Sequence, residues 1–194
     1  MAKLIYVYSE LPSYIRIKKN LALFSQLFDE VLFIGANRSG GQIIHESFPE
    51  NVKFSIYDKK ISHGGLGSIF QSIGFAFYVL SVLRQNSADV IVFVNEELLW
   101  ITEFLTYRPR IICEILDSLA IRTFGVVSYF EPVFKFYCNH FYKKCDSIVE
   151  VSKHRLEYRN YPHKSVVVIP NSPVTSTLDL DFFPELNGLD YIYV

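Results

Sequence analysis

The stretch that most constrains the fold is residues 145–173, where two apolar runs flank a more polar segment. The first run, 147–151, ends at Ser152, which can cap a short helix, and the second run, 165–169, stops at a Pro-Asn pair that ends with Asn171. Strand, short helix and strand together predict one βαβ unit with parallel strands. Ser152 and Asn171 therefore fall at the carboxyl edge of a parallel sheet, where open α/β folds usually bind ligands.

Strands and helices alternate along most of the remaining chain. Apolar runs rich in β-forming residues predict strands at 4–8, 31–35, 52–57, 90–94 and 111–116. Helices are expected at 14–28, 64–83, 97–106 and 129–144, the last with Pro132 in its first turn. This alternation predicts an α/β, Rossmann-like fold with a mostly parallel sheet and helices on both faces. With 194 residues, the chain is long enough for one such domain with a substantial core.

Residues 64–83 carry no charged side chain, so they have to be weighed as a membrane span. The segment is marginal in length for a span, and it contains Gly64, Gly65, Gly67, Gly74 and three serines. A buried helix of the domain explains this composition better. The glycines at its start resemble a phosphate-binding loop, but the P-loop lysine and the G-x-G-x-x-G spacing are missing. A tight turn into the helix is therefore favoured.

Composition argues against several classes of partner. The net charge of −1 provides no overall positive field, so nucleic acid is not an expected partner. Cys113, Cys138 and Cys145 lack C-x-x-C spacing and are predicted to be buried free thiols, the last two on one face of a helix. Five scattered histidines show no ligand spacing, so no metal site is predicted. The chain starts without a secretory signal pattern, and a cytoplasmic location is expected.

Three basic residues lie on the predicted helix 14–28: Arg16, Lys18 and Lys19. They could contact an anionic lipid-phosphate carrier or the headgroups at the inner face of a membrane, which would make the protein peripheral there. The alternative is an ordinary solvated helix face, which is the more frequent explanation for such charges.

The tail departs from the alternating pattern. Residues 179–190 hold four acidic side chains, a proline and an Asn-Gly pair, without Lys or Arg, and are predicted to be a solvated linker. The last residues, 190–194, begin a new apolar β run. This run is either the first strand of a further domain or a short C-terminal edge strand. The expected division is a domain at 1–178 followed by the linker and possible strand at 179–194.

Several motifs resemble the N-terminal domain of GT-B-fold glycosyltransferases of the family-4-like, group 1 type. The runs C-D-S-I-V-E-V-S and V-V-V-I-P-N, within 145–173, resemble the close of that domain. The run A-D-V-I-V-F-V-N-E, at 88–96, resembles a P/A-D-V-I-H-x-H segment but departs from it where the family has histidine. The run C-E-I-L-D-S-L, at 113–119, resembles a Y-D-x-x-D-x-L run, and Asp117 occupies the matched position.

The resemblance implies a transferase of the hexosyltransferase type that moves a sugar from a nucleotide-sugar donor to a glycan or lipid-linked acceptor, in cell-envelope or exopolysaccharide synthesis. This chain would be its acceptor-side half. The donor site, with the family's E-x(7)-E motif, belongs to a C-terminal domain that would be this chain's partner. No cofactor or donor is therefore expected on this domain, and the chain alone is expected to be inactive. The alternative is a stand-alone, non-catalytic α/β binding or interaction module.

Three loops are expected to converge at the carboxyl ends of the strands: 9–14, 95–97 and 117–122. Asp117 is the candidate catalytic residue, with helix capping as its alternative role, and Glu97 more simply favours a helix N-terminus. Ser152 and Asn171 are expected to face an interdomain cleft. The candidate acceptor-binding residues are Ser9, Glu10, Tyr14, Asn95, Glu96 and Arg122.

Overall fold

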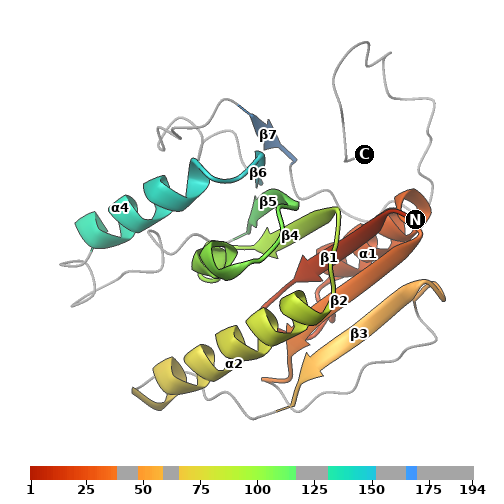
Figure 1. Cartoon of the computed structure of the whole chain (residues 1–194), viewed down its shortest axis with the longest axis horizontal. Helices are drawn as coiled ribbons and strands as arrows, with labels where there is room; N and C mark the ends of the chain where they lie inside the picture. The colour runs from red at the N-terminus through yellow and green to blue at the C-terminus, as the bar shows by residue number, and fades with distance from the viewer. Residues whose placement is uncertain (39–47, 59–65, 117–130, 152–164, 170–194) are drawn as a thin grey trace.

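The computed structural model describes residues 1–38, 48–58, 66–116, 131–151 and 165–169 (Figure 1). Strands and helices alternate along these ranges. The elements are β1 Lys3–Val7, α1 Ile15–Leu27, β2 Glu30–Ala36, β3 Val52–Tyr57, α2 Leu66–Gln85, β4 Val90–Val94, the 3-10 helix η2 Leu99–Phe104, β5 Arg110–Ile115, α4 Glu131–Tyr142, β6 Ser147–Glu150 and β7 Val166–Val168.

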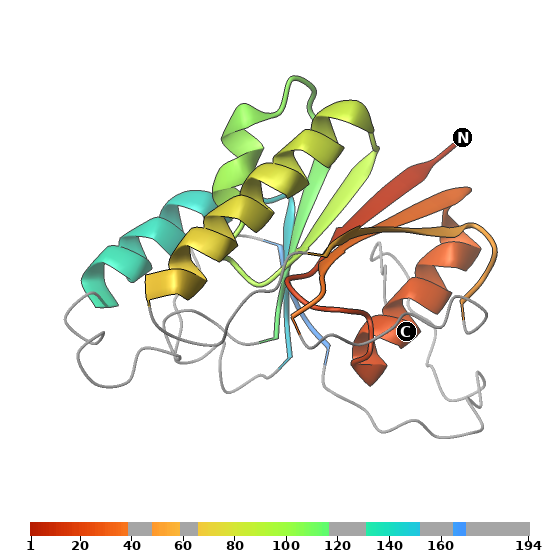
Figure 2. The ribbon, with the colours of Figure 1, turned by 90° about the horizontal axis from the view of Figure 1, so that it is seen from below.

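The strands of the described chain form one sheet in the order β3-β2-β1-β4-β5-β6-β7, and each neighbouring pair is parallel. The direction of strand addition reverses between β1 and β4, as in Rossmann-like folds. Helix α1 covers one face of the sheet, whereas α2, η2 and α4 lie on the other (Figure 2). The predicted α/β, Rossmann-like fold is confirmed, and the sheet is parallel throughout its described part.

Both faces of the central strands are buried, because helices cover each of them. One core cluster joins alternate strand residues such as Ile5, Ile91 and Cys113 to α2, η2 and α4. The other joins the intervening residues, among them Val92 and Ile112, to α1. The continuous apolar runs in the sequence are the consequence of this two-sided burial.

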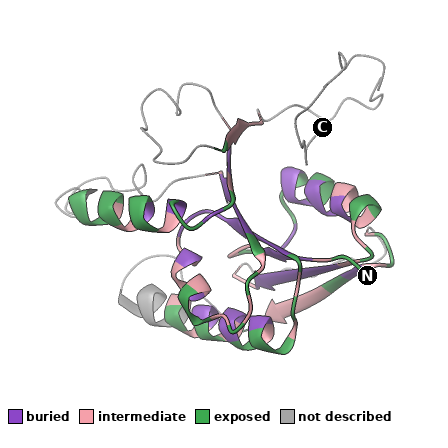
Figure 3. Ribbon diagram, turned by 45° about the horizontal axis from the view of Figure 1, so that its top comes forward, coloured by how far each residue is buried: buried purple, intermediate pink, exposed green. Residues whose placement is uncertain are grey.

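The helix predicted at 64–83 is α2, and its described part buries one side against the sheet. Phe75, Val79 and Leu83 are buried, but 61% of the Phe77 side chain is exposed, because only one face of the helix meets the sheet (Figure 3). Gly74 allows a close approach: a Cβ atom there would lie 2.6 Å from the Tyr57 hydroxyl oxygen on β3. Within the described residues, no helix has the length and hydropathy needed to cross a membrane.

Two local expectations are corrected. The predicted helix 97–106 is the shorter 3-10 helix η2, and its cap has no side-chain hydrogen bond. Cys145 lies beyond the end of α4 at Tyr142, so it does not share a helical face with Cys138. Both thiols and that of Cys113 are nevertheless buried and free, as predicted.

Candidate functional site

The loops that follow β1, β4 and β5 leave the same edge of the sheet, because these strands are parallel neighbours. In the first loop, Ser9 is half-buried, while Glu10 and Tyr14 are exposed at the entrance to α1. This loop lies close against β2, since a Cβ atom on Gly35 would come within 2.6 Å of the Glu10 carbonyl oxygen. Ser9, Glu10 and Tyr14 thus follow the carboxyl end of β1, and their acceptor contacts stay a prediction.

Asn95 shapes the end of β4. Its backbone has a φ of 65°, in the left-handed region that asparagine tolerates better than most residues. Its amide donates to the Glu114 carbonyl oxygen at 2.7 Å, and its Oδ1 accepts from the Leu116 amide at 2.9 Å. The side chain thereby extends the link between the β4 and β5 ends, and Asn95 is 3% exposed. The structure gives it a role in building the edge, and acceptor binding stays a prediction.

Glu96 points away from solvent toward α4. It is fully buried, and its Oε1 accepts a hydrogen bond from the Tyr142 hydroxyl at 2.7 Å. The Tyr137 hydroxyl donates to the Glu96 carbonyl oxygen at 3.1 Å, so two tyrosines of α4 contact this residue. Burial, followed by the nearby Glu96 charge, raises the pKa of Tyr142, which therefore stays a donor. In this conformation Glu96 holds α4 and does not offer its carboxylate to a ligand from solvent.

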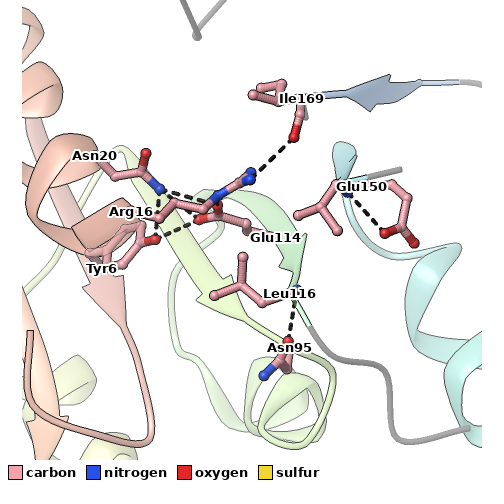
Figure 4. Close-up of polar contacts among 9 residues, drawn as sticks. Tyr6, Arg16, Asn20, Asn95, Glu114, Leu116, Glu150 and Ile169 are labelled. Atoms are coloured by element: carbon pink, nitrogen blue, oxygen red, sulfur yellow. Dashed lines mark hydrogen bonds and ion pairs between the residues drawn. The ribbon is translucent and has the colours of Figure 1, made fainter. Parts of the chain in front are cut away.

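A polar network lies on the α1 side of the same edge, where sequence reasoning predicted none (Figure 4). Its centre is Glu114, the penultimate residue of β5, which is fully buried. Its Oε1 accepts from Arg16 Nε at 2.6 Å, and its Oε2 accepts from the Tyr6 hydroxyl at 2.5 Å. Asn20 Nδ2 lies 3.1 and 3.0 Å from the two carboxylate oxygens. A buried charge requires such partners, so the network satisfies Glu114.

Arg16 has neither of the two roles considered from the sequence, contact with a lipid phosphate or membrane and a place on a solvated helix face. It is 8% exposed, so it neither meets a membrane nor forms part of a solvated face, whereas Lys18 and Lys19 of the same helix are exposed. Its guanidinium also donates through Nη1 to the Ile169 carbonyl oxygen at 3.2 Å. The network thus connects α1 and β5 with the residue that directly follows β7.

A third buried carboxylate ends β6. Glu150 is fully buried, and its Oε1 accepts from the Val151 amide at 2.9 Å. Glu96, Glu114 and Glu150 therefore lie at or near the carboxyl ends of three successive strands, and each accepts a hydrogen bond from a protein donor. A lone acid inside an apolar strand run, as in R-I-I-C-E-I, is the sequence signal that could have revealed Glu114, because such an acid needs a buried partner.

Asp117, Arg122, Ser152 and Asn171 lie outside the described residues. Asp117 follows Leu116 directly, and Asn171 lies two positions after Ile169. Their catalytic, acceptor-binding and cleft roles stay predictions.

Neither protein-family models nor curated proteins match this sequence. Solved glycosyltransferase structures do match its fold. Sucrose-phosphate synthase from Thermosynechococcus elongatus is 8% identical, with a TM-score of 0.65, over 88% of this chain and 48% of that chain. HepE from Anabaena, solved in complex with UDP and glucose, is 11% identical, with a TM-score of 0.57, over 88% of this chain and 44% of HepE. A glycosyltransferase from Rickettsia africae is 14% identical, with a TM-score of 0.55, over 87% of this chain and 42% of that protein.

The chain spans about half the length of these three proteins. At such identities the likeness establishes the fold alone. The described chain therefore has the Rossmann-like fold of a GT-B glycosyltransferase domain, as the sequence resemblance implied.

Proposed function

We propose that this chain is the acceptor-side half of a GT-B glycosyltransferase. The observation that carries the proposal is the fold match of 88% of the chain to about half the length of enzymes such as sucrose-phosphate synthase. The motifs near the ends of β4, β5 and β7 support the same assignment. The complete enzyme would transfer a sugar, of hexose type, from a nucleotide-sugar donor to a glycan or lipid-linked acceptor in cell-envelope or exopolysaccharide synthesis.

In this proposal the acceptor meets the edge formed by the loops after β1, β4 and β5. The donor belongs to the chain's own C-terminal partner domain, so residues 1–194 alone bind nucleotide sugars weakly and do not turn them over. This division is supported by the position of the polar loops at the carboxyl edge, where open α/β sheets bind ligands. The protein is expected to work in the cytoplasm.

A first test is direct. Residues 1–194 and the polypeptide extended by its natural downstream sequence are incubated with a panel of UDP- and GDP-sugars, and nucleotide release is measured with and without a glycan or lipid-linked acceptor extract. Only the extended protein is expected to release nucleotide. Turnover of any nucleotide sugar by residues 1–194 would refute the division of labour. A reading frame that stops directly after residue 194 would favour the alternative, a non-catalytic binding module.

Asp117 is tested in the complete enzyme. If its carboxylate takes part in the chemistry, Asp117→Asn should lower turnover about a hundredfold or more with little change in melting temperature, because the amide keeps the shape and much of the capping ability. If Asp117 is a cap alone, the Asn variant stays active and Asp117→Ala costs about 1 kcal/mol of stability. Near-normal turnover of the Asn variant would remove Asp117 from the catalytic residues.

Peripheral membrane contact is a second proposal, and the structure favours α4 over α1 for it. Val133 and Phe136 on α4 are 61% and 75% exposed, and the cationic side chains of Lys135 on the same helix and of Lys143, directly after it, are exposed as well. Apolar side chains flanked by cations suit an anionic bilayer surface. Vesicles with phosphatidylglycerol should cosediment the chain in a salt-sensitive manner, and Phe136→Ser should weaken this. Equal binding to pure phosphatidylcholine, or an undiminished variant, would contradict the proposal.

A further inference from the structure

Strand β7 is weakly held within the described chain. It is three residues long, its residues are half-buried, and it pairs with β6 at the end of the described sheet. The Ile169 amide, directly after the strand, donates to the Glu150 carbonyl oxygen at 2.8 Å. A short edge strand with little buried surface is expected to open easily by itself. A contact from elsewhere in the fold therefore has a large influence on where its end lies.

Arg16, near the N-terminal end of the sequence, supplies such a contact. It is separated from Ile169 by 153 positions, and its Nη1 donates to the Ile169 carbonyl oxygen at 3.2 Å. Through Nε, the same planar group is fixed at 2.6 Å to Glu114. Ile169 also packs against the core cluster on the α1 side, whereas Val166 of β7 packs against the opposite cluster. Ile169 therefore faces the α1 side of the sheet, and Arg16 of α1 contacts its carbonyl oxygen there.

We propose that Arg16 is a positioning residue that uses Glu114 as its anchor to hold the end of β7 against the start of α1. The guanidinium is suited to this, because its rigid fork of donors can engage a carboxylate and a carbonyl oxygen at once. Tyr6 and Asn20 also donate to Glu114, so its buried carboxylate keeps protein donors besides Arg16 even when one of these two bonds is removed. The guanidinium is nearly excluded from solvent, which strengthens both interactions.

The consequence is that the start of α1 and the end of β7 are held together. The loop 9–14 leads directly into α1, in whose first turn Arg16 lies, and Asn171 follows soon after Ile169. In a two-domain transferase, the clamp would keep the acceptor loop in a fixed relation to the end of β7. This link to an acceptor rests on the proposed function, whereas the clamp itself can be tested without substrate, so the two can fail separately.

The test is amide hydrogen exchange on residues 1–194, comparing the native sequence with Arg16→Lys. The lysine variant keeps the charge beside Glu114 but has one nitrogen, which cannot reproduce both branches of the fork. Exchange at the Ile169 amide should become about tenfold faster or more, since one charge-assisted hydrogen bond near it is lost. The β2–β3 amides serve as an internal reference and should stay unchanged to within about twofold once global stability is matched with urea.

Tyr6→Phe is the matched control. It removes a hydrogen bond to Glu114 but leaves the contact between Arg16 and Ile169, so any effect should follow global stability and show no selectivity for Ile169. Unchanged protection of Ile169 in Arg16→Lys would overturn the proposal. The proposal would also be overturned if the exchange rates of the β2–β3 amides rose as much as that of Ile169, or if Tyr6→Phe accelerated exchange at Ile169 as selectively as Arg16→Lys.

Discussion

Replacing Glu114 by glutamine should destabilise the fold far more than its small change in shape implies. The substitution removes the negative charge and replaces one acceptor oxygen by an NH2 group. It thereby leaves the charge of Arg16, a residue only 8% exposed, without its carboxylate partner. Breaking a buried pair by removing one partner typically costs about 3–5 kcal/mol, because the remaining charge is uncompensated. For a domain of this size, each kcal/mol lowers the melting temperature by about 2–4 °C, so a fall of roughly 6–20 °C is expected.

The assay is equilibrium unfolding in urea, followed by far-UV circular dichroism and by the fluorescence of the single tryptophan, Trp100. Trp100 packs on the face opposite the network, so it reports global unfolding and not local change. The double variant Arg16→Met/Glu114→Gln removes both charges and should recover at least half of the lost stability, as neutral replacement of buried pairs often does. A cost below about 1 kcal/mol for Glu114→Gln, or simple additivity in the double variant, would refute the reasoning.

Three further predictions follow from local geometry. Gly74→Ala should destabilise the fold by up to about 2 kcal/mol, since overpacking against the Tyr57 hydroxyl outweighs the gain in helix propensity. In a Tyr57→Phe background the nearest ring atom, Cζ, lies 3.7 Å from the added Cβ, and urea unfolding should show that Gly74→Ala stabilises instead. Burial raises the pKa of the Cys113 thiol and raises that of Cys145 to about 12, and Cys138 is buried as well, so thiol reagents at pH 8 should label none of the three before unfolding. Lys3 and Lys53 lower the pKa of Glu30, so the stabilisation of the fold by the Glu30 carboxylate is present above its ordinary pKa of 4.5 and is lost as the pH falls through the lowered value. Glu30→Gln should therefore flatten that part of a curve of unfolding free energy against pH.

Much of the fold could be predicted from local patterns. The runs at 4–8 and 90–94 are continuous in apolar residues because both faces of β1 and β4 are covered, and this burial is visible in one dimension. Helical spacing likewise located α1 and α4 to within a few residues. The alternation of the two element types then favours parallel pairing, since a crossover helix returns the chain to the same edge of the sheet.

The network around Glu114 could not be predicted in the same way. The acid in C-E-I-L signals a need for a partner, but Tyr6 and Arg16 are 108 and 98 positions away in the sequence. Their meeting depends on the strand order, which places β4 alone between β1 and β5 and α1 above them. Sequence reasoning therefore assigned Arg16 to the surface, because helix periodicity does not reveal a counter-charge in a distant strand.

The sequence by itself determined where most strands and α-helices of the described chain lie, which loops leave the carboxyl edge, and that the thiols are buried, because these properties follow from local hydrophobicity and chain direction. The tertiary structure decided that Asn95 and Glu96 bond to the protein, and that Arg16 spans from Glu114 to Ile169. Polar groups acquire such roles through partners brought together by packing, and the cost of burying a charge is settled by those partners, wherever they lie in the sequence.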